Sequence, residues 1–224
     1  MDIASITPVA QDYLKAIWSA TEWGGVPATG KTLAARFGTT TANASDVVKR
    51  LTAQGLLTHE PYRAIELTPA GERVAIAMVR KHRLIEAFLV TSLGYGWDEV
   101  HDEAEILEHA ASSLLIERID ALLGYPRADP HGDPIPLASG ETRHPVGAVV
   151  LTVAPVGPYI VERISDDDPG RLGYFAEVGL VPGADADVTA QDAHAHTTRL
   201  ATAIRVDVTL GAPASAAVWV SPRP

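Results

Sequence analysis

The chain has 224 residues, of which 46% are hydrophobic and 21% are charged, and it contains no cysteine. This composition is typical of a globular protein and excludes a disordered chain, a collagen-like repeat and a coiled-coil rod. The lack of cysteine excludes disulfides, thiolate zinc sites and cysteine nucleophiles, so any metal must be bound through nitrogen and oxygen. The sequence has neither an apolar run of membrane-spanning length nor a secretory signal, so we expect a soluble cytoplasmic protein.

The net charge of -10 is unevenly distributed along the chain. Residues 1–71 carry six basic and six acidic side chains, residues 72–145 carry seven and 13, and residues 146–224 carry five and nine. The first third is therefore the part of the chain that can approach a polyanion, provided that its basic side chains share one face.

The first 71 residues have the element order of a winged helix-turn-helix. Helical periodicity and strand-like alternation predict three helices and a hairpin over 12–21, 31–37, 42–54, 56–60 and 64–68. Gly38 and Gly55 stand where helix C-termini favour glycine. The third helix begins with small polar side chains, as a helix that enters the DNA major groove does.

Two kinds of side chain are expected to contact DNA. Small polar groups at the start of the third helix suit direct or water-mediated contacts with bases, and these are Thr40, Thr41, Asn43, Ser45 and Asp46. Side chains that follow, or that lie in the hairpin turn, are expected to contact phosphates, and these are Lys49, Arg50, Tyr62 and Arg63. For Lys49 and Arg50 the alternative is an ordinary solvated helix face.

The rest of the chain changes from helical to strand-like patterning. A long helix is predicted from Pro69 to about Leu93, and two further helices over 98–111 and 113–123 carry enough apolar residues to form a dimer interface. Proline-rich residues then predict a linker. Five strands of a small barrel are predicted over 146–153, 159–164, 186–189, 203–210 and 217–220.

These elements predict an α+β protein with four parts. They are a winged helix-turn-helix DNA-binding domain over 1–71, a helical dimerisation and metal-binding domain over 72–124, a proline-rich linker over 125–145 and a small β-barrel domain over 146–224.

Imidazole and carboxylate groups recur at helical spacing in the middle of the chain. The helix that begins near Asp98 carries four of them on one face, namely His101, Glu105, Glu108 and His109. The preceding helix adds His82 and Glu86 at i, i+4 spacing. Such groups on facing helices can enclose a metal ion.

The alternative is a charged, solvated helix surface. However, six acidic residues lie between positions 98 and 108 with no Lys or Arg among them, so a counter-cation would relieve their repulsion. The donor set suits Mn(II) or Fe(II) and tolerates Zn(II) or Co(II).

Together these residues resemble the diphtheria toxin repressor family of iron- and manganese-dependent transcriptional repressors. The resemblance covers nearly the whole chain. Its most specific motifs are Asp-Tyr-Leu at 12–14, Arg-Lys-His-Arg-Leu-x-Glu at 80–86, His-Asp-Glu-Ala-Glu-x-x-Glu-His at 101–109 and Gly-Asp-Pro-Ile-Pro at 132–136.

The resemblance implies that the barrel is SH3-like and that a metal-loaded homodimer binds operator DNA near uptake genes. It also implies two metal sites. The primary site would use Asp12, Glu105, Glu108 and His109. The second site would use His82, Glu86 and His101, with Asp168 as a ligand from the barrel.

The same resemblance bears on the choice of metal. Iron-type members carry Met and Cys at the positions of Asp12 and Glu105, whereas manganese-type members carry carboxylates at both, so the sequence favours Mn(II). An Fe(II)-dependent repressor of iron uptake genes is the alternative. A metal-dependent enzyme or a storage protein is a further one, although no catalytic motif supports an enzyme.

Overall fold

The computed structural model describes residues 6–60 and 63–223. The chain divides into two compact units, Met1–Lys81 with Pro136–Glu141 and His82–Ile135 with Thr142–Pro224. Helix α4 (Pro69–Leu93) begins in the first unit and ends in the second, and its bounds are those predicted from the sequence. No helix among the described residues is long and apolar enough to cross a membrane.

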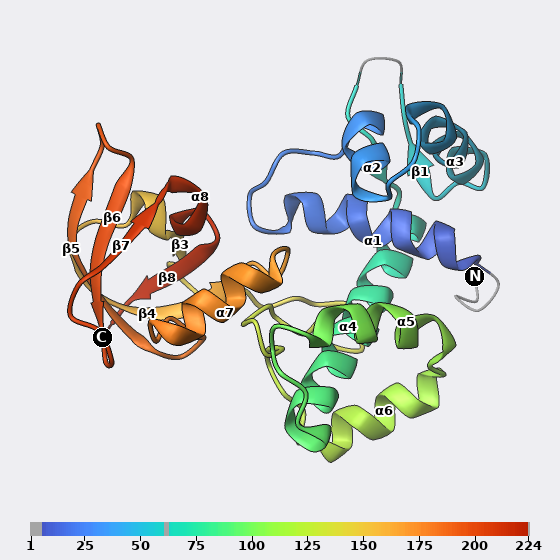
Figure 1. Ribbon diagram of the computed structural model, residues 1–224. Coiled ribbons are helices and arrows are strands. Elements are labelled where there is room, and N and C mark those ends of the chain that lie inside the picture. Colours follow the sequence, from blue (N-terminus) through green and yellow to red (C-terminus); the bar gives the residue numbers. More distant parts are fainter. Residues whose placement is uncertain (1–5, 61–62, 224) are drawn as a thin grey trace. The chain divides into compact units, whose positions relative to one another are not determined.

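The first unit is a winged helix-turn-helix, as predicted (Figure 1). Before α4 it contains α1 (Pro8–Glu22), α2 (Gly30–Arg36), α3 (Thr41–Ala53), β1 (Leu57–Thr58) and β2 (Glu66–Leu67). The two strands pair antiparallel, with Leu57 opposite Leu67. Apolar side chains from the helices and the hairpin form one core, including Leu14, Leu33 and Leu51.

Hydroxyl groups fix where the second and third helices begin. Thr29 and Thr32 form a capping box at α2, in which each side chain bonds to the other's backbone amide. The Thr40 hydroxyl accepts a hydrogen bond from the Asn43 amide at 3.1 Å and caps α3. These caps satisfy amides that a helix N-terminus leaves unpaired, so the turn between the helices has a defined geometry.

In the second unit, α4 is followed by α5 (Val100–Ala110) and α6 (Ser113–Leu122). Buried residues of the three helices form a second core, which includes Leu84, Leu89, Ala104 and Ile116. Ile135, from the segment after α6, joins the same core, so this segment packs against the helices.

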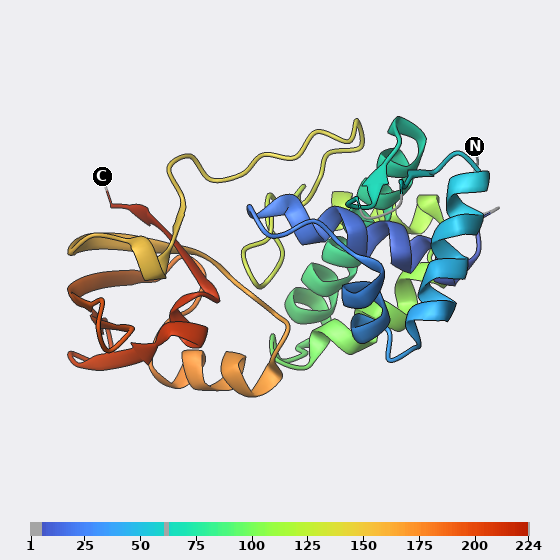
Figure 2. The same ribbon diagram turned by 90° about the horizontal axis from the view of Figure 1, so that it is seen from above.

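The C-terminal part of this unit is a single antiparallel sheet with the strand order β3-β8-β4-β5-β6-β7. Its elements are β3 (Val149–Val150), the 3-10 turn at Leu151–Val153, β4 (Gly157–Ile164), α7 (Pro169–Glu177), β5 (Asp185–Asp192), β6 (Thr197–Thr202), β7 (Val208–Gly211), α8 (Ala212–Ser215) and β8 (Val218–Pro222). The sheet encloses a third core, and Figure 2 shows it from a second direction with α7 in orange at its periphery.

The strand pattern differs from the sequence prediction at three places. The strand predicted over 146–153 is limited to Val149–Val150, and Leu151–Val153 form a 3-10 helix instead. Residues 197–202 form β6, which was not predicted, and the predicted strand over 203–210 begins only at Val208. The apolar residues Ile204 and Val206 imitate strand alternation, but both are exposed. A turn instead joins β6 to β7, because the Thr202 hydroxyl accepts a hydrogen bond from the Arg205 amide.

The junction between the wing and α4 predicts one sensitive glycine. A Cβ at Gly71 would collide with the Leu56 carbonyl oxygen, whereas a Cβ at Gly30 would meet no atom within 4 Å. We expect Gly71→Ala to lower the free energy of unfolding by about 1–3 kcal/mol, the usual cost of overpacking. We expect Gly30→Ala to leave it unchanged or raise it, because alanine favours a helix. Urea denaturation measures both, and equal effects would contradict the close packing at Gly71.

Candidate metal centre

His82 lies between two buried carboxylates on neighbouring helices. Its Nδ1 atom is 2.7 Å from Glu108 Oε2 on α5, and its Nε2 atom is 2.9 Å from Glu86 Oε1 on α4. Glu86 and Glu108 have almost no exposed side-chain surface, at 1% and 0%. Because water cannot reach these charges, they need a cation or a hydrogen-bond donor between them.

His101 extends this cluster toward the barrel. Its Nδ1 atom is 3.3 Å from Glu86 Oε1 and 2.9 Å from Oδ2 of Asp166, which lies just after β4. The His82 and His101 rings meet edge to face at 4.8 Å. Each of the four residues thus offers a nitrogen or oxygen atom within 4.8 Å of the others, as metal ligands do.

A second cluster lies on the other side of Glu86. Glu86, Asp129 and His131 are all buried and also offer atoms within 4.8 Å of one another. His131 Nε2 is 2.6 Å from the Trp97 carbonyl oxygen and therefore donates to it, which leaves Nδ1 of the neutral ring as an acceptor.

Two atoms of this second cluster have no hydrogen-bond partner among the described residues. They are Glu86 Oε2 and His131 Nδ1, which lie 3.9 Å apart. Unpaired acceptors cost about 1–3 kcal/mol each when buried. A divalent cation between two such acceptors would remove this cost, so the residues present fit a metal ion.

The carboxylates of α5 form a third grouping with His82. Glu105, Glu108 and His82 offer atoms within 4.8 Å of one another, and His109 Nε2 is 3.9 Å from Glu108 Oε1. His82 therefore contacts both the α5 carboxylates and the residues around Glu86. These clusters contain only oxygen and imidazole nitrogen donors, a set that suits Mn(II) and is also compatible with Fe(II).

The electrostatics of the cluster favour charged carboxylates beside a protonated imidazole. Burial lowers the pKa of His101, but hydrogen bonds to Asp166 and Glu86 outweigh burial and raise this pKa to about 10. Burial raises the pKa of Glu86, but the charge of His82 and hydrogen bonds from both histidines lower it to about 2. The pKa of Asp166 is lowered for the same reason, mainly through His101.

The pKa of Asp129 is shifted in the opposite direction from those of Glu86 and Asp166. Burial and the nearby carboxylates of Asp133 and Glu86 raise its pKa well above the ordinary value, although Arg83 opposes this. A bound cation beside Asp129 would oppose this shift, because it would stabilise the charged carboxylate.

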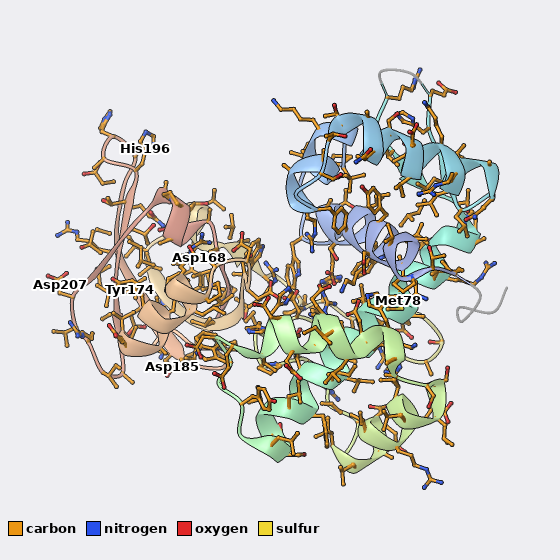
Figure 3. All side chains as sticks on the ribbon, turned by 45° about the vertical axis from the view of Figure 1, so that its right-hand side comes forward. Met78, Asp168, Tyr174, Asp185, His196 and Asp207 are labelled. Atoms are coloured by element: carbon orange, nitrogen blue, oxygen red, sulfur yellow. The ribbon has the colours of Figure 1, made fainter. Side chains whose placement is uncertain are left out.

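Among the candidate ligands of the helices, the structure brings together His82, Glu86, His101, Glu105, Glu108 and His109, but the barrel differs from the sequence prediction. Asp168 caps α7 through a hydrogen bond from the Arg171 amide and pairs with the Arg171 guanidinium at 3.3 Å. Figure 3 labels Asp168 in this part of the chain. Asp166, two residues earlier, is the aspartate that lies against His101. Asp12 lies on α1 in the first unit.

Three candidate ligands were missed by the sequence analysis: Asp129, His131 and Asp166. The family resemblance indicated Asp168, whereas Asp166 lies two residues earlier in a run of three aspartates at 166–168 that no spacing rule distinguishes. Asp129 and His131 lie in an irregular segment with no periodicity, so no spacing rule marked them.

The predicted DNA-contacting side chains lie on α3 and beside the wing. Thr40, Thr41, Asn43, Asp46, Lys49, Arg50 and Arg63 are exposed, whereas Ser45 is half-buried. Tyr62 lies outside the described residues. The Asn43 side-chain amide donates to the Thr39 hydroxyl at 3.1 Å, and Lys49 pairs with Asp46 at 3.4 Å.

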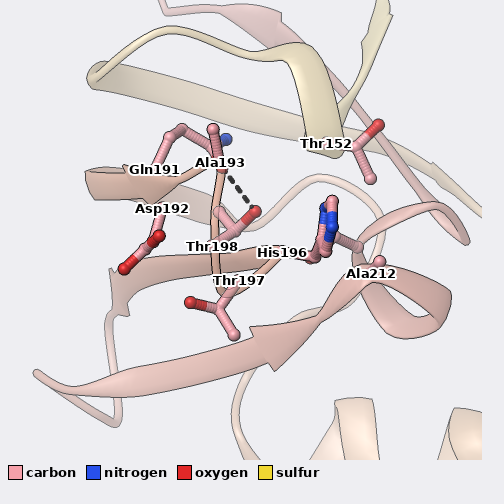
Figure 4. A pocket seen from close by; sticks show the side chains of 9 residues that line it. Thr152, Gln191, Asp192, Ala193, His196, Thr197, Thr198 and Ala212 are labelled. Atoms are coloured by element: carbon pink, nitrogen blue, oxygen red, sulfur yellow. Dashed lines mark hydrogen bonds between the residues drawn. The ribbon is translucent and has the colours of Figure 1, made fainter.

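A pocket of about 180 Å³ in the barrel has a different character (Figure 4). The Thr198 hydroxyl donates to Gln191 Oε1 at 2.8 Å, and the Gln191 amide nitrogen donates to the carbonyl oxygens of Leu151 and Ala154. His196 lines this pocket without a second imidazole. Because its polar groups are used to join strands to the 3-10 turn, we regard it as structural.

A winged helix-turn-helix followed by helices with clustered imidazole and carboxylate ligands defines a metal-binding regulator of transcription. The chain matches the models of two domains: iron dependent repressor, N-terminal DNA binding domain, over residues 5–65, and iron dependent repressor, metal binding and dimerisation domain, over residues 68–137. It belongs to the diphtheria toxin repressor family of metal-dependent transcriptional repressors. The barrel is consistent with the SH3-like domain of that family.

Repressors named for iron and repressors named for manganese are both similar to this chain. The iron-dependent repressor IdeR of Mycobacterium leprae is 34% identical over 188 residues, which cover 79% of this chain and 81% of that protein. The diphtheria toxin repressor of Corynebacterium diphtheriae is 34% identical over 192 residues, with 81% and 84% covered. A solved structure of a manganese-dependent transcriptional repressor in complex with manganese is 48% identical, with a TM-score of 0.90 and 96% and 100% covered.

The raised pKa of His101 predicts how the stability of the metal-free protein depends on pH. Its folded-state pKa of about 10 exceeds the ordinary value of 6.5, so its stabilising effect is full below about pH 6.5 and is lost as the pH rises toward 10. We expect the melting temperature in a chelating buffer to fall between pH 6.5 and 9.5. His101→Gln should reduce this fall, whereas the exposed His194→Gln should not. An unchanged pH dependence in His101→Gln would refute the assignment.

Proposed function

We propose that this protein is a Mn(II)-dependent dimeric repressor that binds operator DNA when loaded with metal and controls genes of metal uptake. The observation that carries the proposal is the ligand set. The clusters around His82 and Glu86 contain only imidazole and carboxylate donors, and two buried atoms there, Glu86 Oε2 and His131 Nδ1, have no hydrogen-bond partner among the described residues. Hard oxygen donors weaken the preference for metals later in the Irving–Williams order.

We propose two metal-binding regions. The primary one uses Glu105, Glu108 and His109 together with Asp12, and its support is the family motif. Asp12 belongs to the DNA-binding domain, so its participation would tie that domain to the helical domain and set the spacing of the recognition helices.

The second region uses His82, Glu86 and His101. We assign Asp166 as its ligand from the barrel in place of Asp168, because Asp166 contacts His101 whereas Asp168 caps α7. Asp129 and His131 complete this region on the far side of Glu86. A bound divalent cation supplies the positive charge that these buried carboxylates need.

Fe(II) is the second candidate metal, and it has support of its own. The similar IdeR protein is named an iron-dependent repressor, whereas the structure with 48% identity is named manganese-dependent. Carboxylates at positions 12 and 105 support Mn(II). Zn(II) and Co(II) are expected to substitute in vitro, and a related protein, ScaR, was solved with bound Zn(II).

The exposed start of α3 supports contact with double-stranded DNA. We propose that Thr40, Thr41, Asn43, Ser45 and Asp46 face the bases and that Lys49, Arg50, Tyr62 and Arg63 contact phosphates. Because each protomer offers only a few basic side chains, its electrostatic attraction to DNA is weak. We therefore expect binding to need two half-sites, and hence a dimer.

Metal-dependent binding to the protein's own upstream DNA tests the function. Under anaerobic conditions, we expect Mn(II) to lower the dissociation constant for DNA, measured by fluorescence anisotropy, and a chelator to reverse the effect. Glu108→Gln removes a fully buried candidate ligand and should weaken the metal response at least about tenfold.

Asp102→Asn is the matched control, because Asp102 is exposed on the same helix. DNA binding that ignores every metal would overturn the switch. Binding that responds to Fe(II) but not to Mn(II) would select the iron-dependent alternative. Metal binding without any DNA binding would favour a storage protein or an enzyme.

The apolar surface of α5 and α6 supports the dimer. Five large apolar side chains are 38–70% exposed on these two helices: Ile106, Leu107, Leu114, Leu115 and Leu122. A monomer would leave this whole surface in water, whereas a two-fold interface would bury it.

Charge on this surface should dissociate the dimer. Burying a leucine contributes roughly 1.5–3 kcal/mol, so we expect Leu115→Glu with Leu122→Glu to raise the dimer dissociation constant at least about a hundredfold. Analytical ultracentrifugation measures this, with the exposed barrel pair Val153→Glu and Val156→Glu as the control. A variant that remains dimeric would place the interface elsewhere.

A further inference from the structure

Asp133 joins an arginine of the helical region to an arginine of the barrel. Its Oδ1 atom is 2.8 Å from Arg163 Nε on β4 and 3.3 Å from Arg83 Nη2 on α4. The side chains of all three residues are at most 11% exposed. Because a buried ion pair is costly to break, this bridge resists separation of the barrel from α4.

The segment that carries Asp133 has a fixed shape. Asp129 Oδ1 accepts hydrogen bonds from the amides of His131 and Asp133, each at 2.9 Å. Between them, Gly132 has φ +88°, and a Cβ there would collide with the Glu162 carbonyl oxygen. The backbone of this segment therefore lies directly against β4.

The end of β4 is held by the same segment. The Ile164 amide donates to the His131 carbonyl oxygen at 2.9 Å, and the Arg163 guanidinium lies 4.4 Å from the centre of the Trp219 ring. Asp166 follows two residues after Ile164. The position of Arg163 thus fixes the end of β4, and the backbone leads from there to Asp166, whose carboxylate contacts His101.

We propose that Asp133 is a positioning residue for metal binding: by holding Arg163 against Arg83, it keeps Asp166 in place on His101. Asp133 itself belongs to none of the candidate ligand clusters among the described residues. The inference rests on the proposed function in one respect, namely that Asp166 is a metal ligand. Partners that orient a ligand typically change metal affinity by about 10–100-fold when they are lost.

A double-mutant cycle tests this inference on the full-length protein. Isothermal titration calorimetry with Mn(II) measures affinity for the wild type, Asp133→Asn, Asp166→Asn and the double variant, well below their melting temperatures. We expect Asp133→Asn to weaken Mn(II) binding by about 10–100-fold in the wild-type background and by less than about twofold in the Asp166→Asn background.

The matched control is Asp207→Asn, the same change at an exposed position of the barrel (Figure 3), and it should leave the affinity within about twofold. If Asp133→Asn alone fails to fold, the variant Asp133→Asn with Arg163→Met replaces it, because this variant removes the partner cation as well. It should show the loss of Mn(II) affinity that is expected for Asp133→Asn. Unchanged affinity in these variants, or an equal loss in both Asp166 backgrounds, would overturn the inference.

Hydrogen exchange of the metal-free protein separates this inference from the proposed function. The Ile164 amide should exchange at least about tenfold faster in Asp133→Asn than in the wild type or Asp207→Asn, because its bond to His131 depends on the bridge. If the wild type binds no Mn(II), the proposed function fails. Slow exchange in Asp133→Asn would show that Asp133 does not hold the end of β4.

Discussion

Two buried glutamates in the second unit each need a positively charged partner. Glu86 and Glu108 are shielded from water on neighbouring helices, and each would be strongly destabilising without a positive partner. One imidazole, that of His82, lies within hydrogen-bond distance of both. Protons on the histidines or a divalent cation can each supply the missing charge. In the proposed site, a cation and the protons would compete for the same atoms, so metal binding would depend on pH.

The parts of the site that lie on helices could be predicted from the sequence. The bounds of α4 followed from Thr68 and Pro69 at its start and from uninterrupted helical periodicity. Helix geometry then fixed which side chains share a face, so spacing alone was enough to pair His82 with Glu86 and His101 with Glu105. The winged helix was predictable for the same reason, because its caps and turns are local.

The positions of the remaining candidate ligands depend on contacts between distant segments. Asp129 and His131 lie in a turn whose residues, taken alone, indicate only a proline-rich linker, and Asp166 is one of three consecutive aspartates. Their selection depends on the packing of this turn against α4 and β4, which no periodicity encodes. The error at 203–207 has a related origin, since apolar alternation predicts burial but Ile204 and Val206 have no core to enter.

The proposed ligand set would also give the barrel a physical role, namely to hold Asp166 beside the helices. The cluster around Glu86 draws its atoms from α4, α5, the segment after α6 and the end of β4. Bringing four segments together costs conformational entropy unless other contacts have already fixed them. The bridge from Arg83 through Asp133 to Arg163 provides such contacts without using a ligand atom. With Asp166 as the proposed ligand, the affinity for metal and the position of the barrel would be linked, because any interaction that moves the barrel would also move Asp166.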